Sequence, residues 1–110
     1  MFDLGVVPAG CDLRVTLELR NDGEAERTVT KLIPSCSCTT ARLESPRLAP
    51  GEVRPVPVQV SAPLSAGPQS SDIFVSAASG PARIVRLRYR TEGEPDPAQV
   101  VRDEPLVVRL

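Results

Sequence analysis

The sequence predicts one all-β domain, built as a sandwich of short strands. Several segments alternate apolar and polar side chains, and turn residues separate them at the spacing typical of such sandwiches. No segment has a convincing helical periodicity. A chain of 110 residues is also the size of a single small domain, so we expect one fold unit.

The first strand is expected over residues 2–7 and the second over residues 13–20. In the second, four apolar side chains alternate with four polar ones: Leu13, Val15, Leu17 and Leu19 against Arg14, Thr16, Glu18 and Arg20. Such a strand has one face in the core and one face in water. It ends at the hairpin-type turn Asn-Asp-Gly, residues 21–23. A strand over 27–34 follows, and a short one over 39–43.

The next expected strand begins after the turn Ala-Pro-Gly at residues 49–51 and carries valine at every second position of one face. Its other face carries Pro55 and Pro57. Prolines two positions apart remove amide groups that would point to the same side of the strand. That side is therefore predicted to be a sheet edge or a poorly paired border.

Two further strands are expected around residues 73–77 and 85–89, which completes a sandwich domain over residues 1–90. From 91 to 103 the composition becomes acidic and contains proline, which is typical of a linker. Residues 104–110 alternate again and form a terminal strand. This strand pairs with its own domain, pairs with a partner chain, or is the first strand of a neighbouring domain.

Composition excludes several function classes. The chain has no histidine, which is the commonest general base, and 3% aromatic residues, which is too few for stacking platforms. It has no phosphate-binding glycine loop, and its net charge of −1 attracts neither nucleic acid nor an anionic membrane. No run of about 18 apolar residues predicts a membrane span. We therefore expect neither an enzyme nor a resident cofactor.

The Cys-x-Cys pair, Cys36 and Cys38, is the clearest chemical feature of the sequence. Residues at i and i+2 of an extended backbone point to the same face, with Cα atoms roughly 6.6 Å apart. Both thiols can therefore hold one object. The third cysteine, Cys11, makes the count odd, which leaves at least one thiol free unless a metal or another chain takes it.

Four stretches of the sequence resemble a known family: FDLGVVPAG (2–10), LRNDG (19–23), PSCSCT (34–39) and LAPGE (48–52). Their order and approximate spacing resemble the bacterial domain-of-unknown-function family 1573, which is related to the Hydin-like domains. The resemblance covers residues 2–90. It implies an immunoglobulin-like β-sandwich of about seven strands in two antiparallel sheets, with no catalytic activity.

The family resemblance also bears on location, because its members are usually secreted, periplasmic or surface proteins. The start of this sequence shows no basic stretch followed by an apolar stretch, the pattern of a secretory signal. We therefore expect either a periplasmic or extracellular chain trimmed from a longer precursor, or a cytoplasmic one.

This sequence departs from the family pattern at Ser37, where the family usually has glycine, and at Cys11, which lies outside the pattern. Serine adopts positive φ less readily than glycine, which argues against a disulfide between Cys36 and Cys38. In an immunoglobulin-type topology the connections after the first and third strands lie at one end of the sandwich. All three sulfurs could then meet there.

Three interpretations of the cysteines follow. The first is structural: either half-buried thiols, or a disulfide from Cys11 to Cys36 or Cys38 that staples the sandwich, since one such bridge stabilises a small domain by about 2–4 kcal/mol. The second is a thiolate metal site of Cys36, Cys38 and Cys11 that binds Cu(I), or Zn with a fourth ligand from elsewhere. The third is redox or covalent attachment chemistry at the pair.

Three arginines lie in a stripe on one face of the strand expected around residues 85–89: Arg86, Arg88 and Arg90. They form either a solvated face or a docking surface for an anionic ligand. A candidate ligand for it is the acidic segment at 92–96. Sheet edges offer a second mode of contact, by strand addition from a protein partner or from another copy. We therefore expect a non-catalytic structural or protein–protein interaction module of a larger bacterial envelope protein.

Overall fold

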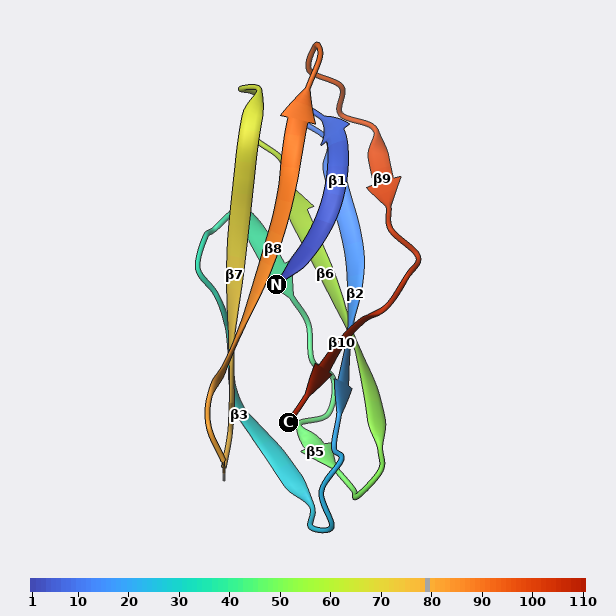
Figure 1. Ribbon diagram of the computed structural model, residues 1–110, viewed down its shortest axis with the longest axis vertical. Helices are drawn as coiled ribbons and strands as arrows, with labels where there is room; N and C mark the ends of the chain where they lie inside the picture. Colours follow the sequence, from blue (N-terminus) through green and yellow to red (C-terminus); the bar gives the residue numbers. More distant parts are fainter. Residues whose placement is uncertain (79) are drawn as a thin grey trace.

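The computed structural model describes residues 1–78 and 80–110, and its regular elements are ten β-strands (Figure 1). They are β1 (Phe2–Pro8), β2 (Asp12–Arg20), β3 (Arg27–Pro34), β4 (Thr39–Ala41), β5 (Arg47–Leu48), β6 (Val53–Ser61), β7 (Gly67–Ala77), β8 (Arg83–Glu92), β9 (Gln99–Val101) and β10 (Leu106–Arg109). The predicted all-β class is confirmed. Within the described residues no helix has the length and hydropathy of a membrane span.

The strands form two sheets that run along an elongated molecule of 48 × 22 × 21 Å (Figure 1). One sheet has the order β1-β8-β7-β3-β5 and the other the order β10-β2-β6-β4. The strand β9 pairs with residues 12–14 of β2, whereas β10 pairs with residues 17–20 of the same strand. Buried side chains from both sheets form one hydrophobic cluster. The predicted burial of the apolar face of β2 is confirmed, because Leu13, Leu17 and Leu19 are fully buried in that cluster.

The prediction of two antiparallel sheets is wrong, because both sheets are mixed. The strand β1 runs parallel to β8, and both β9 and β10 run parallel to β2. Turn residues in a sequence indicate antiparallel pairing only between strands joined by a short hairpin. These parallel pairs join segments far apart in the chain, so no turn determines their direction.

The proline-bearing side of β6 is a border of its sheet, as predicted. The edge strand β4 pairs only with residues 58–60 of β6. Just beyond, the Arg42 amide donates to the Pro57 carbonyl oxygen at 3.2 Å, so this side of Pro57 can accept a hydrogen bond but has no N–H to donate. Pro55, two residues away on the same side, likewise has no N–H to donate.

The segment after β8 crosses from one sheet to the other (Figure 1). Its backbone follows the first connection of the chain, where the Asp96 amide donates to Ala9 O and the Asp12 amide donates to Ala98 O. The range 91–103 is thus more than a linker, because it contains the end of β8 and all of β9. The terminal strand pairs in cis, since β10 lies along residues 17–20 of β2.

Candidate functional site

The Cys-x-Cys pair is a disulfide in this structure. The sulfurs of Cys36 and Cys38 lie 2.08 Å apart and their Cα atoms 5.2 Å apart, in the turn between β3 and β4. Cys11, in the connection between β1 and β2, is a free and buried thiol. The predicted bridge from Cys11 to Cys36 or Cys38 is therefore wrong.

The order of the strands explains why Cys11 does not reach the pair. Cys11 O accepts from the Ala62 amide at 2.9 Å and Cys38 O accepts from the Ser61 amide at 2.8 Å, so both cysteines do lie at the same end of the molecule. They lie on opposite sides of β6, however, because β2 and β4 flank that strand. Two strand spacings amount to about 10 Å, whereas bridged Cα atoms lie about 4.4–6.8 Å apart.

Ser37 does not prevent the bridge between its neighbours. Among the described residues, every positive φ belongs to a glycine, so the turn closes without the left-handed conformation that serine disfavours. The prediction that Ser37 disfavours this disulfide is therefore wrong, because Ser37 does not adopt a positive φ.

The structure does not assemble the predicted Cu(I) or Zn site. Two of its three sulfurs are bonded to each other, and the third lies across β6. A thiolate ligand needs a free, deprotonated sulfur. In the part of the chain that the structure describes, no group of three or more Cys, Asp or Glu side chains is placed to hold a metal ion.

The disulfide turn is held by hydrogen bonds that do not involve the S–S bond. The Ser35 amide donates to Asp72 O at 2.8 Å, and the Asp72 amide donates to Ser35 Oγ at 3.0 Å, which ties the turn to β7. On the other side, the Thr39 hydroxyl lies 2.6 Å from the buried Ser71 hydroxyl. The turn therefore has anchors on both flanks of the half-exposed cysteine pair.

Two contacts distinguish the sulfurs from each other. The Cys38 amide donates to Cys36 Sγ at 3.1 Å, whereas Cys38 Sγ lies 3.7 Å from the Thr39 hydroxyl. Cys36 Sγ is thus the sulfur that already accepts a hydrogen bond from the backbone.

As a staple, this disulfide is weak. It closes a loop of only three residues within one turn, for which the chain-entropy relation gives about 1.6 kcal/mol, against about 3 kcal/mol for a 15-residue loop. It joins no pair of strands that would otherwise separate. Stability alone therefore gives little reason for the bond.

The free thiol of Cys11 should be almost unreactive in the folded protein. Burial, and secondly the negative charge of Asp12, raise the pKa of Cys11 above its ordinary value, so little thiolate forms near pH 8. We expect an aromatic disulfide reagent at pH 8 to label the folded chain at least about tenfold more slowly than the chain in urea. The variant Cys11→Ser, labelled in neither state, is the control. Fast labelling of the folded wild type would contradict the buried position.

The arginine stripe on β8 is largely paired with side chains of its own domain. Arg86 holds Asp72 through two hydrogen bonds of 3.0 and 3.2 Å, and this contact lowers the pKa of Asp72. Arg90 pairs with Glu92 at 3.2 Å, and Arg88 donates to Met1 Sδ at 3.3 Å. Within the described residues, Glu92 is the one member of the acidic segment at 92–96 with an ion pair to the stripe.

An unpaired edge lies at the start of β8, and sequence reasoning missed it. The pairing of β1 with β8 begins at Phe2 opposite Leu87, so among the described residues no strand lies along 83–86 of β8 on that side. A hollow of about 520 Å³ lies there between β8 and β10, lined in part by Phe2, Ile84 and Val107. We call this hollow the edge slot.

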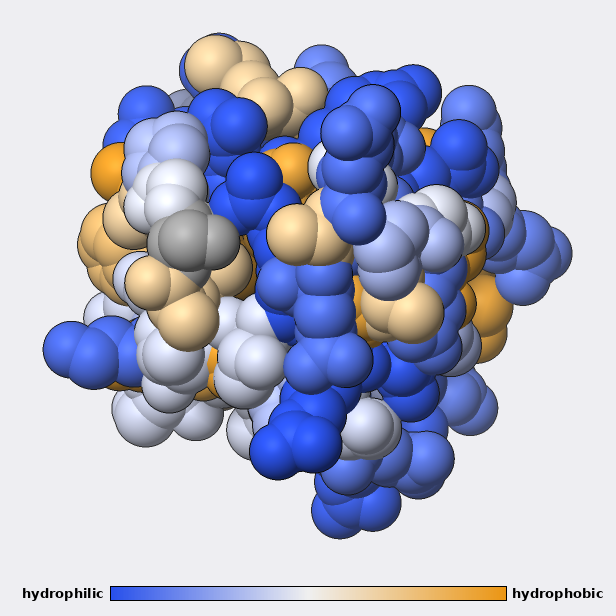
Figure 2. Space-filling model, turned by 90° about the horizontal axis from the view of Figure 1, so that it is seen from below, coloured by the Kyte–Doolittle hydropathy of each residue, from blue (hydrophilic) through white to orange (hydrophobic). Residues whose placement is uncertain are grey.

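Figure 2 views the molecule from the end at which β8 begins. Hydrophilic side chains dominate this end, and hydrophobic residues reach the surface in separate areas. Ile84 of the edge slot is 59% exposed. The alternation of β8 assigns Ile84 to the outer face, but only the tertiary structure shows that β1 stops short of it.

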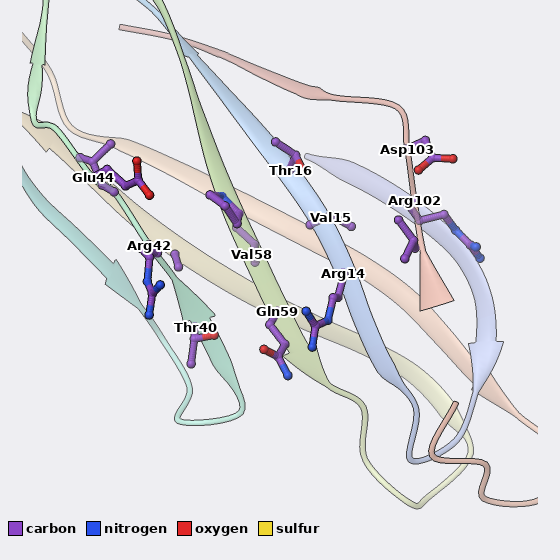
Figure 3. Close-up of a pocket in the computed structure, with 14 residues that line it drawn as sticks. Arg14, Val15, Thr16, Thr40, Arg42, Glu44, Val58, Gln59, Arg102 and Asp103 are labelled. Carbon is purple, nitrogen blue, oxygen red and sulfur yellow. The ribbon is translucent and has the colours of Figure 1, made fainter. Parts of the chain in front are cut away.

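A hollow of about 1000 Å³ lies on the outer face of β2, β6 and β4 (Figure 3). Thr40, Gln59 and Arg14 form a row across these strands on its floor. Its lining carries both signs of charge and no aromatic residue, so it does not select one class of ligand. Sequence patterning indicates these polar faces but not the folded-back segment at 101–103 that makes them concave.

These features define a class of protein: a small all-β domain with two mixed sheets, one core and a half-exposed disulfide turn. The chain belongs to the family described as "Protein of unknown function (DUF1573)", whose model matches residues 1–92. The predicted family membership is confirmed. No curated protein matches the chain.

Solved structures share the fold at low sequence identity. The secreted serine protease VesC from Vibrio cholerae matches with a TM-score of 0.64 and 17% identity, over 81% of this chain and 21% of that one. The protease VesB from Vibrio cholerae has 0.54 and 22%, over 82% and 30%. A GH5 xyloglucanase from Bacteroides ovatus has 0.54 and 19%, over 82% and 17%. The chain thus spans less than a third of each of these three proteins.

Proposed function

We propose that this protein is an immunoglobulin-like, non-catalytic interaction module of a larger bacterial envelope protein. The grouping β2-β6-β4 in one sheet and β8-β7-β3 in the other supports this topology, because immunoglobulin domains group their B-E-D and G-F-C strands in this way. The disulfide supports an oxidising compartment such as the periplasm. The chain matches only a small share of larger proteins, and one of those proteins is titled as secreted. This supports a role as one module of a larger protein.

The observation that carries the proposal is the unpaired edge of β8 at residues 83–86. A strand edge with free backbone groups accepts an extended segment of another protein by β-addition. Here the added segment continues the line of β1 along β8 and closes the edge slot. Main-chain hydrogen bonds supply the affinity of such a contact, and the slot's side chains supply its specificity.

The edge slot indicates what kind of segment fits. Phe2, Ile84 and Val107 offer apolar contacts in its lining. Arg83 and Arg109 also line it, and Arg83 has no ion pair within the described part of the chain. The partner segment is therefore extended, with apolar residues at alternate positions and acidic residues between them.

Other edges are less open to strand addition. Arg102 covers the outer edge of β1 by donating to Leu4 O at 3.0 Å and to Val6 O at 3.1 Å. The border of β6 lacks donors at Pro55 and Pro57. The edge strands β4 and β5 are only three and two residues long. We therefore propose the contact at the edge slot rather than at these other edges.

Selection of displayed peptides against the folded domain tests this function. We expect the selected peptides to alternate apolar and acidic residues and to protect amides of residues 83–86 from hydrogen exchange. Ile84→Lys should weaken their binding by about tenfold or more, because it places a charge in the apolar centre of the contact. The control is Val101→Lys, at an equally exposed valine of β9. Binding that survives Ile84→Lys, or no selected peptide at all, would count against the edge slot.

A further inference from the structure

We propose that the Cys36–Cys38 disulfide is a thiol–disulfide exchange site for a protein that carries a reduced dithiol. This activity lies beyond the proposed interaction role and uses another part of the molecule, the turn between β3 and β4. It is a stoichiometric exchange in which this chain accepts two electrons from its partner.

The cysteine pair is half-exposed, and the turn has anchors that do not depend on the S–S bond. Cys36 and Cys38 are half-exposed, and Ser37 between them is exposed, whereas Cys11 is buried. The anchors from Ser35 to β7 and from Cys38 O to the Ser61 amide do not depend on the S–S bond. The reduced turn therefore keeps its two thiols close together, ready for reoxidation.

The contacts of the two sulfurs determine which of them an incoming thiolate attacks. The Cys38 amide donates to Cys36 Sγ at 3.1 Å, and such a donor stabilises a thiolate more than a neutral sulfur. Cys36 is therefore the better leaving group, and an incoming thiolate attacks Cys38 Sγ. The Thr39 hydroxyl, 3.7 Å from Cys38 Sγ, contacts the sulfur that carries the mixed disulfide.

The exchange balances in two steps. A thiolate of the partner dithiol forms a bond to Cys38 Sγ, the Cys36–Cys38 bond breaks, and its electron pair goes to Cys36 as a thiolate. The second partner thiolate then attacks the partner sulfur of this mixed disulfide and releases Cys38 as a thiolate. The partner is left as a disulfide, and the two protons lost by its thiols go to Cys36 and Cys38. The partner is oxidised by two electrons and this chain is reduced by two.

The test uses the oxidised full chain and a thioredoxin-type protein in which the second cysteine of its Cys-x-x-Cys motif is replaced by serine, so that the partner cannot carry out the second step and the adduct is collected by acid quenching. We expect a covalent adduct with the folded chain, located at Cys38 over Cys36 by about tenfold, the factor expected when one charge-assisted hydrogen bond favours one leaving group. The double variant Cys36→Ser/Cys38→Ser should give no adduct. Cys11→Ser should react like the wild type.

Three results would overturn the exchange site. One is an adduct that forms only after unfolding in urea. Another is an adduct located mainly at Cys36, and the third is unfolding of the domain when the bond is reduced by dithiothreitol, detected by circular dichroism. The edge slot is tested separately, because Ile84→Lys should leave the exchange unchanged and reduction should leave peptide binding unchanged.

Discussion

Deletion of residues 104–110 is expected to lower the free energy of unfolding by about 3–6 kcal/mol, the effect of exposing two buried aliphatic side chains. Those side chains are Leu106 and Val108, which are 9% and 8% exposed within the common core. The deletion also leaves residues 17–20 of β2 without the strand that pairs with them. A chain of this size has little stability in excess of such a loss.

Urea unfolding followed by circular dichroism measures this effect. The matched control is Val107→Ala, at a half-exposed position of the same strand, which should cost less than about 1 kcal/mol. Leu106→Ala and Val108→Ala should each fall between the control and the deletion. If the deletion costs no more than the control, β10 does not belong to the folding unit of β2.

Replacing Asn21 by aspartate is expected to destabilise the domain by about 3–5 kcal/mol at pH 7, the usual effect of an uncompensated buried charge. Asn21 is fully buried at the end of β2. Its amide nitrogen donates to Ala25 O at 2.9 Å and to Leu48 O at 3.0 Å, while its side-chain oxygen accepts from the Gly23 amide at 3.0 Å. Aspartate keeps the shape but places a carboxylate oxygen against two carbonyl oxygens.

The pH dependence distinguishes this mechanism from a loss of packing. Burial raises the pKa of the new carboxyl above its unfolded value of about 3.9, so the folded state prefers the protonated form. The difference in unfolding free energy between variant and wild type should therefore be small near pH 4 and grow as the pH rises. Urea unfolding at several pH values measures it. Asp22→Asn, at the exposed neighbour that pairs with Arg109, should cost no more than about 1 kcal/mol. A difference between Asn21→Asp and wild type that does not change with pH would rule out the charge as its cause.

Local patterning predicts the faces of long strands, because each side chain of a strand reports its own burial. The alternation in β2 therefore identifies its buried leucines, and the paired prolines identify the border of β6. Strands of two or three residues carry no such periodic signal, so β5 and β9 escape prediction. Their positions depend on neighbouring strands that the sequence does not indicate.

The candidate site is less predictable than the strands, because it depends on the order of strands across a sheet. Cys11 and Cys38 lie at one end of the molecule, as predicted, but β6 separates them. This separation determines which cysteines can form a disulfide. The edge slot likewise depends on where β1 ends relative to β8. Such relations join residues distant in the chain, and turn chemistry and alternation do not report them.

Arg102 connects the segment after β8 to the first strand of the chain. It follows the family-matched region, which ends at residue 92, yet its guanidinium covers carbonyl groups of β1, the first strand. A domain cut at the family boundary would present β1 as an uncovered template on which further copies could polymerise edge to edge. The segment downstream of the family match therefore occupies two carbonyl groups of β1 that an added strand would otherwise use.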